Sequence, residues 1–157
     1  MGQSTRATKA LEQAGVAFAV HGYAYDPTAE RVGLQAAEAL GADPSRVLKS
    51  LMAWADGKAA CAIVASDREV SLKALAAAVG AKSAAMMAPA DAERLSGYKV
   101  GGISPFGQTR LRHVVLDEAA LVHPLVFING GQRGLQVELS PRDAAAALGA
   151  KVAPIAR

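Results

Sequence analysis

Two apolar runs separated by a short turn constrain the fold of this chain more than any other feature. The runs span residues 47–55 and 59–65, and Asp56-Gly57 lies between them. An Asp-Gly pair supplies the positive φ angles of a tight hairpin turn, and apolar runs on both sides of it are typical of paired strands. We therefore predict an antiparallel β-hairpin at the centre of the fold.

The rest of the chain alternates between helix signals and strand signals. Ser4 or Thr5 can cap a first helix that ends at Gly15, because short polar side chains accept hydrogen bonds from the first N–H groups of a helix. By similar reasoning we expect helices at 33–40, 71–79, 89–95 and 141–149, and strands at 16–23, 113–116, 125–128, 135–139 and 151–155. The order predicts one α/β domain over residues 1–157, with a mixed, largely antiparallel sheet flanked by helices.

The strand expected at 135–139 shows a clear alternation of side chains. Its apolar positions are Leu135, Val137 and Leu139, and Gln136 and Glu138 lie between them. A strand with this pattern has one buried face and one polar face. We therefore expect Gln136 and Glu138 on the polar face.

Composition and charge exclude several classes of protein. A chain of 157 residues, 52% of them hydrophobic, can bury a substantial core without disulfides or metal. No stretch approaches the roughly 18 apolar residues of a membrane helix, and no signal-peptide core is present. The net charge of +3 permits an anionic partner but is small for a dedicated duplex-DNA binder. We expect a soluble cytoplasmic protein with no membrane or DNA partner and with its one cysteine, Cys61, buried.

Familiar catalytic and cofactor motifs are absent from the sequence. It contains no Gly-x-Ser-x-Gly elbow, no P-loop, no dinucleotide fingerprint and no His-Glu-x-x-His pair. His21, His113 and His123 are scattered and lack the spacing of metal ligands. We therefore expect no metal, no cofactor and no catalytic triad.

A glycine-rich segment at 97–107 is the first candidate binding feature. It reads Gly-Tyr-Lys-Val-Gly-Gly-Ile-Ser-Pro-Phe-Gly. Glycine allows positive φ angles and close approach of the backbone, so the segment can simply be a tight connection between two elements. It can also present the bare N–H groups around Gly101 and Gly102 to a bound molecule. The aromatic, cationic and hydroxyl side chains within the segment favour this second interpretation.

Two further segments can bring charge to a site. Lys49 and Ser50 lie in the first apolar run, on opposite faces of the expected strand. A lysine there either extends to water at a sheet edge, or holds a phosphate or stabilises negative charge on a carbonyl oxygen. Residues 129–134 read Asn-Gly-Gly-Gln-Arg-Gly, which is typical of a hairpin turn. Within this turn, Arg133 can bind a phosphate or pair with a carboxylate such as Asp143.

In this order, the segments resemble the YbaK family of aminoacyl-tRNA deacylases, whose best-described members act on Cys-tRNA(Pro). The Gly-Gly-Ile-Ser-Pro and Gly-Gly-x-Arg-Gly segments are specific in combination. The likeness covers essentially the whole chain and is carried by Tyr23, Asp26-Pro27, Ala36-Ala37, Leu40-Gly41, Lys49-Ser50-Leu51, Gly97-Tyr98 through Gly107, Gly130-Gly131, Arg133-Gly134, Glu138 and Asp143.

The resemblance implies a compact domain, related to the editing domain of some prolyl-tRNA synthetases, that removes a wrong amino acid from tRNA(Pro). It makes Lys49 the main functional side chain, with the N–H groups of Gly101 and Gly102 as the expected stabilisers of negative charge. In such proteins the cysteine thiol of the substrate is thought to attack its own ester. The implied substrate-binding residues are Tyr23, Ser50, Ile103, Ser104, Pro105, Gly130, Gly131, Arg133, Gly134 and Asp143.

Departures from the family pattern leave alternatives open. Ser50 stands where threonine is common, and Gln132 where lysine is frequent. The chain can instead remove another small residue, such as alanine or serine, with water as the attacking group. A different class of function is a module that binds tRNA or a synthetase without turnover. Selection of the tRNA is either intrinsic or delegated to a bound prolyl-tRNA synthetase, and the modest charge favours delegation.

Overall fold

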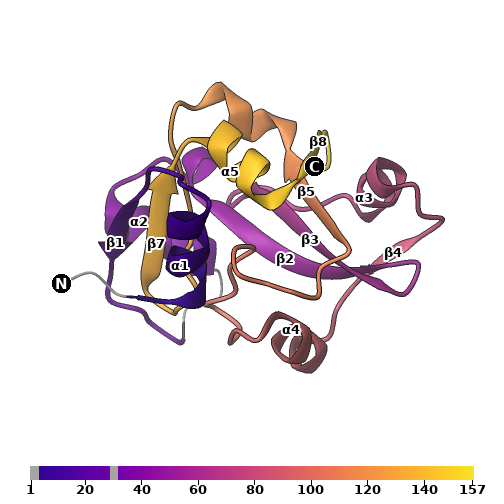
Figure 1. The fold of residues 1–157 in the computed structure, drawn as a ribbon, viewed down its shortest axis with the longest axis horizontal. Coiled ribbons are helices and arrows are strands. Elements are labelled where there is room, and N and C mark those ends of the chain that lie inside the picture. Colours follow the sequence, from indigo (N-terminus) through magenta and orange to yellow (C-terminus); the bar gives the residue numbers. More distant parts are fainter. Residues whose placement is uncertain (1–3, 29–31) are drawn as a thin grey trace.

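The chain folds into two β-sheets with helices packed around them (Figure 1). The structure is a computed structural model, and it describes residues 4–28 and 32–157. Its helices are α1 (Arg6–Gln13), α2 (Val32–Leu40), α3 (Leu72–Val79), α4 (Pro89–Ser96) and α5 (Pro141–Leu148), with short 3-10 helices at Pro44–Arg46 and Glu118–Val122. Its strands are β1 (Ala19–Gly22), β2 (Leu48–Ala55), β3 (Lys58–Ala65), β4 (Ala84–Met86), β5 (His113–Asp117), β6 (Val126–Asn129), β7 (Leu135–Leu139) and β8 (Lys151–Ala153). The expected α/β class is confirmed.

The expected hairpin lies at the centre of the larger sheet. Strands β2 and β3 pair antiparallel over their full length. Asp56 and Gly57 connect them with φ angles of 49° and 77°, and two successive positive φ angles define a type I′ turn. Every residue of β3 after Lys58 is buried, including Cys61. Both faces of β3 therefore contribute to the core.

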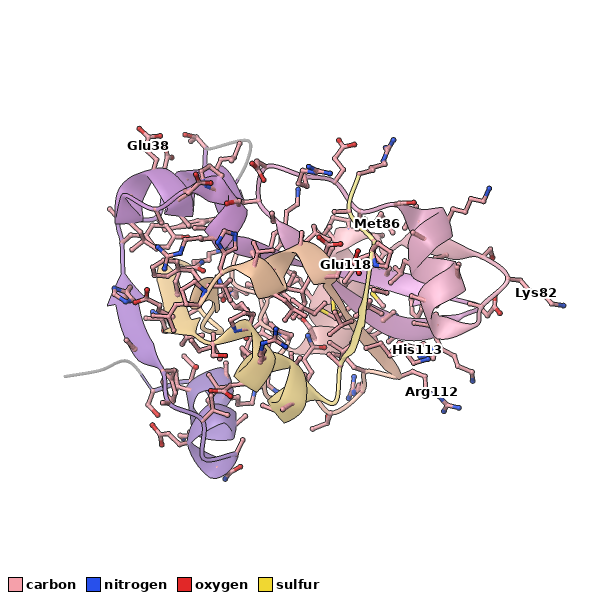
Figure 2. The ribbon with its side chains drawn as sticks, turned by 90° about the horizontal axis from the view of Figure 1, so that it is seen from above. Glu38, Lys82, Met86, Arg112, His113 and Glu118 are labelled. Carbon is pink, nitrogen blue, oxygen red and sulfur yellow. The ribbon has the colours of Figure 1, made fainter. Side chains whose placement is uncertain are left out.

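The helix ends follow the capping signals in the sequence. The Thr5 hydroxyl accepts a hydrogen bond from the Thr8 N–H at 3.1 Å, and the Thr8 side chain closes a capping box. Charged side chains such as those of Glu38 and Lys82 point away from the body of the molecule (Figure 2). Within residues 4–28 and 32–157, no helix has the length and apolar character needed to cross a membrane.

The strands divide between a three-stranded sheet, β1-β7-β6, and a five-stranded sheet, β4-β2-β3-β5-β8. The smaller sheet is antiparallel, whereas β5 runs parallel to β3 and β8 runs parallel to β5. The larger sheet is therefore mixed, as expected. Strand β4 was not predicted, because Ala-Ala-Met carries little strand signal. The first strand is also shorter than the predicted 16–23.

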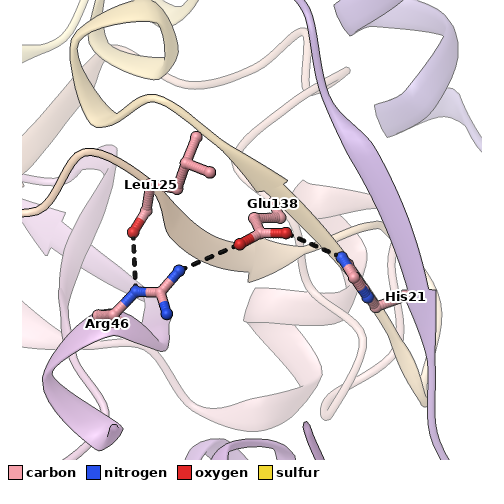
Figure 3. A network of polar contacts seen from close by, with 4 residues as sticks. All are labelled: His21, Arg46, Leu125 and Glu138. Atoms are coloured by element: carbon pink, nitrogen blue, oxygen red, sulfur yellow. Dashed lines mark hydrogen bonds and ion pairs between the residues drawn. The ribbon is translucent and has the colours of Figure 1, made fainter. Parts of the chain in front are cut away.

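The polar face of β7 is covered, which corrects one expectation. Gln136 is only 4% exposed. Helix α2 covers this face of the smaller sheet, because Ala36 and Ala37 pack with Phe127. Further along the same face, the Glu138 carboxylate bridges His21 Nε2 at 3.0 Å and the Arg46 guanidinium at 3.1 Å (Figure 3). The alternation is as predicted, but the polar face of β7 is not a solvent-exposed one.

One edge of β2 changes partners along its length. Val47 pairs with Phe127 of β6 in an isolated bridge, and β4 pairs only with Ala53–Ala55. Between these two points, residues 49–51 pair with no strand on this edge in the described part of the chain, while the other edge of β2 is fully paired with β3. The fold therefore leaves a gap where the two sheets diverge.

Candidate functional site

A cavity of about 390 Å³ occupies the gap beside β2. Backbone and side chains from β2, β4, α4, the glycine-rich loop and the smaller sheet meet there, with apolar surface predominant. Its lining consists of Leu48, Lys49, Ser50, Leu51, Met52, Ser66, Met86, Met87, Pro89, Ala92, Val100, Gly101, Ile103, Asn129 and Gln136. The cavity therefore collects the two segments that the sequence singled out, the Lys49-Ser50 pair and the glycine-rich loop.

Lys49 and Ser50 both reach the cavity because it wraps around the open edge of β2. Their side chains lie on opposite faces of the strand, as alternation requires. The Met87 N–H donates to the Met52 carbonyl at 3.1 Å, so the backbone groups of Met52 point to this edge. Backbone groups two residues apart in a strand point the same way. Ser50 therefore points its backbone N–H and C=O groups toward the gap. The residue also forms part of the cavity lining.

The glycine-rich loop forms the opposite wall through Gly101 and Ile103. Gly101 has a φ angle of 93°, which a side chain would disfavour. The Gly102 N–H donates to the Lys99 carbonyl at 2.8 Å, so the charge-stabilising role expected for this group does not fit the structure. The N–H groups of Gly101 and Ile103 have no hydrogen-bond acceptor within the described residues.

Gly102 has a structural reason to be glycine. A Cβ atom there would lie 2.7 Å from the backbone nitrogen of Arg133. Cβ atoms in proteins essentially never approach another heavy atom this closely, so only the hydrogen of a glycine fits at this position. The two glycine segments found in the sequence therefore pack directly against each other, backbone to backbone.

The loop is fixed by hydrogen bonds of its own. The Tyr98 hydroxyl donates to the Phe106 carbonyl at 2.6 Å, and the Phe106 N–H donates to the Ser104 hydroxyl at 3.2 Å. Ser104 is fully buried and Pro105 is buried as well. Neither of these two expected pocket residues lines the cavity. They hold the loop in shape behind Gly101 and Ile103.

Asn129 connects the second glycine segment to the loop. Its amide nitrogen donates to the Gly101 carbonyl at 3.3 Å, and its side-chain oxygen accepts from the Gly131 N–H at 2.7 Å. The Gly134 carbonyl accepts from the Tyr23 N–H at 2.9 Å. Gly130, Gly131 and Gly134 lie outside the cavity lining. This segment therefore supports the site, and Asn129 is the residue of it that reaches the cavity.

Two charged residues expected near the pocket lie outside it. Asp143 is exposed in the first turn of α5. The Arg133 Nε donates to the Val100 carbonyl at 2.9 Å, and its guanidinium lies 5.5 Å from the ring centre of Tyr25. The arrangement therefore ties Arg133 to the glycine-rich loop, where the sequence had suggested a pairing with Asp143.

Four buried side-chain polar atoms have no hydrogen-bond partner within 3.5 Å among the described residues. They are the Tyr23 hydroxyl, Ser50 Oγ, Gln108 Oε1 and Gln136 Oε1, and of these residues Ser50 and Gln136 line the cavity. Burial raises the pKa of Tyr23, and a hydrogen-bonding interaction with the Gln136 side chain opposes part of that rise. Gln136 was not among the expected site residues. Alternation put it on a polar face, and only the arrangement of the two sheets around the cavity shows that Gln136 lines it.

The described lining of the cavity contains no activated nucleophile. Among the residues that the structure describes, it has no cysteine, and no histidine that could activate Ser50 or Ser66, and no group of three or more His, Cys, Asp or Glu side chains is placed to hold a metal ion. Cys61 is fully buried in β3, where burial raises its pKa to about 12. The site can therefore orient a reactive molecule and stabilise charge on it, but offers no activated thiol or serine-histidine pair.

Comparisons with known proteins identify a family and a shared fold. Residues 27–147 match the family described as the aminoacyl-tRNA editing domain. A candidate Cys-tRNA(Pro)/Cys-tRNA(Cys) deacylase of Enterococcus faecalis, EbsC, is 32% identical over 143 residues, which is 88% of this chain and 85% of the relative. A solved structure of a candidate trans-editing enzyme for prolyl tRNA synthetase has a TM-score of 0.80 at 27% identity and covers 99% of both chains. The hypothetical protein APE2540, at 22% identity, shares the fold with a TM-score of 0.85 over 98% of this chain and 100% of its own.

Proposed function

This chain belongs to the aminoacyl-tRNA editing domain family, and we propose that it is a trans-editing deacylase that removes cysteine from mischarged tRNA(Pro). The observation that carries the proposal is the meeting of Lys49, Gly101 and Ile103 around one cavity whose described lining contains no cysteine or histidine. An aminoacyl ester is already activated. A site that orients it and stabilises the developing oxyanion is therefore enough for catalysis.

In the proposed reaction the substrate supplies the attacking group. The cysteine thiol loses its proton to water, and its sulfur forms a bond to the ester carbonyl carbon. The C–O bond to the ribose then breaks, its electron pair stays on the ribose oxygen, and this oxygen takes a proton to become the free 3′-hydroxyl of the tRNA. The amino acid leaves as a cyclic thioester.

The protein's part in this reaction is electrostatic and geometric. Lys49 places a positive charge at the edge of the cavity, beside the position of the ester. The N–H groups of Gly101 and Ile103 take over the role first expected of Gly101 and Gly102, because the Gly102 N–H is used within the loop. A loop held by its own hydrogen bonds can offer such donors without reorganising during the reaction.

The apolar wall of the cavity favours a thiol over a hydroxyl. Met52, 4% exposed, and Met87, 8% exposed, belong to this wall together with Ile103. Gln108 donates to Met52 Sδ at 3.6 Å and to the Ser104 carbonyl at 2.8 Å, so it joins this wall to the loop. Burying a serine hydroxyl there without a partner costs about 1–3 kcal/mol, or roughly a tenfold to hundredfold loss.

Recognition of the tRNA body is proposed to depend on prolyl-tRNA synthetase. Lys99 and Arg133 are exposed beside the glycine-rich loop, and both line a second, shallow hollow on its far side. They suit a few phosphate contacts near the 3′ end of the tRNA. The net charge of +3 supports only modest affinity for a whole tRNA.

The test is a deacylation panel with Cys-, Ser- and Ala-tRNA(Pro), each with and without prolyl-tRNA synthetase. The proposal predicts rapid loss of cysteine, slow loss of serine and faster turnover when the synthetase is present. Efficient removal of serine or alanine would support water as the attacking group. Binding of tRNA with no cleavage of any ester would instead support a non-catalytic module.

A further inference from the structure

Two residues of the cavity lining, Ser50 and Gln136, each carry a buried polar atom without a close hydrogen-bond partner among the described residues, and these atoms need an explanation. A buried polar group without a hydrogen bond destabilises a protein by about 1–3 kcal/mol. Tyr23 Oη, Ser50 Oγ and Gln136 Oε1 are all buried and unpartnered within residues 4–28 and 32–157. Ser50 and Gln136 line the cavity, whereas Tyr23 lies outside the lining and its hydroxyl interacts with the Gln136 side chain. These three polar groups are called the polar pole below, and the fourth unpartnered atom, Gln108 Oε1, belongs to a residue outside the lining.

The polar pole can bind a small group that both donates and accepts hydrogen bonds. An amide and two hydroxyls supply neutral donors and acceptors, and each hydroxyl hydrogen can rotate about its C–O bond toward an acceptor. Lys49 carries the only charge among the described residues of the lining. A carboxylate or phosphate group would leave the Gln136 oxygen facing negative charge. A primary amine in its neutral form offers two donors and one acceptor, which matches the three atoms.

The position of the polar pole indicates which part of the substrate supplies this amine. Its atoms are among the most buried in the site, whereas Met86 and Val100 at the cavity lining are 44% and 39% exposed. The ribose is attached to the rest of the tRNA and must stay near the exposed side. The group that reaches the buried end therefore belongs to the amino acid. Apart from the ester itself, the α-amino group is the polar group that aminoacyl esters share.

We propose that Gln136, with Tyr23 and Ser50, binds the free α-amino group of the aminoacyl ester, so that the site accepts aminoacyl esters and rejects N-acylated ones. This inference rests on the proposed deacylase function. Acylation removes a donor from the amine, makes its nitrogen a poor acceptor and adds bulk at the buried end of the cavity. The site is thus expected to spare esters whose amine carries a peptide or another acyl group.

The experiment compares Cys-tRNA(Pro) with N-acetyl-Cys-tRNA(Pro) as substrates of the full chain. The wild type should cleave the free amine roughly 10- to 100-fold faster. Gln136→Met should lower the rate on the free amine by roughly tenfold and leave the N-acetyl rate unchanged, so the preference should largely disappear. Gln13→Met is the matched control, since it makes the same exchange at an exposed position on α1, and it should keep the wild-type preference.

Three results would overturn the inference. The first is an unchanged preference in Gln136→Met, and the second is no preference in the wild type. The third is a Gln136→Met defect that vanishes when the terminal ribose lacks its 2′-hydroxyl, because the polar pole would then bind the ribose. Tyr23→Phe removes one hydroxyl of the same group and repeats the test if Gln136→Met does not fold.

A binding measurement separates this inference from the proposed function. Calorimetry with an unreactive amide analogue, 3′-cysteinylamino-3′-deoxyadenosine, and with its N-acetyl form needs no turnover. If the wild type cleaves no ester, the proposed function fails. Tighter binding of the free-amine analogue to the wild type but not to Gln136→Met would still support the polar pole, and equal binding of both analogues would overturn it.

Discussion

Two serines line the same cavity but differ in their hydrogen bonds, and this difference predicts opposite effects on stability. The Ser66 hydroxyl donates to the Pro44 carbonyl at 2.9 Å, and Ser66 is 3% exposed. The Ser50 hydroxyl is buried and has no partner within the described residues. If Ser50 is kept for substrate and Ser66 for the fold, their replacement by alanine should separate the two roles.

The expected sizes follow from these contacts. Ser66→Ala loses a buried hydrogen bond and should lower the free energy of unfolding by about 1–2 kcal/mol. For a chain of this length that corresponds to a fall in Tm of roughly 3–6 °C. Ser50→Ala removes an unsatisfied hydroxyl, so it should leave the stability unchanged or raise it by up to about 1 kcal/mol.

Urea denaturation of both variants, followed by circular dichroism, measures the difference. Deacylation of Cys-tRNA(Pro) by Ser50→Ala should fall by roughly tenfold despite its intact fold, because the hydroxyl belongs to the polar pole. The reasoning is refuted if Ser50→Ala destabilises the protein as much as Ser66→Ala does. That result would mean that the Ser50 hydroxyl has a structural partner.

Three further predictions concern packing and titration. Gly102→Ala should destabilise the protein by about 2–3 kcal/mol and abolish deacylation, because its Cβ would lie 2.7 Å from the Arg133 backbone nitrogen. Gly22→Ala is the control, since its Cβ would meet its nearest neighbour at 3.9 Å. Equal stability of the two variants in urea would contradict the packing argument. Cys61 should not react with a thiol reagent at pH 8 in the native protein, because burial raises its pKa to about 12. A labelling rate that stays the same when the protein is stabilised against unfolding would contradict this prediction. The pKa of His113 is lowered by burial and by nearby cations, Arg112 among them (Figure 2). Its neutral form is therefore favoured in the folded state, and stability should fall as the pH drops below about 6.5, the ordinary histidine value. His113→Gln should flatten this loss in urea titrations at pH 7.5 and 5.5, and an unchanged slope would exclude His113 as its cause.

Much of the fold could be predicted because its signals are local. Asp56-Gly57 defines the hairpin and its register, since a two-residue turn allows one pairing of the strands. Capping residues such as Ser71 and Ser140 likewise act within a few residues of themselves. The parallel pairing of β5 with β3, and the strand β4, depend instead on contacts between distant segments, which one sequence does not display.

The candidate site was predictable only in part for the same reason. Lys49, Ser50, Gly101 and Ile103 are brought together as the segments suggested. The role of Gly102 was misassigned, because the turn that uses its N–H group depends on backbone geometry. Gln136 was missed, and Asn129 was named only as part of its turn, because which of these side chains reach the cavity is decided by elements that pack on them from elsewhere in the chain.

Single-turnover deacylation of Cys-tRNA(Pro) by the wild type and Lys49→Ala tests the central claim most directly. Lys58→Ala, at the exposed end of the same hairpin, is the charge-matched control. If Lys49 and the loop N–H groups stabilise the oxyanion, Lys49→Ala should be slower by roughly 100-fold or more while Lys58→Ala keeps the wild-type rate. Full activity of Lys49→Ala would contradict the account.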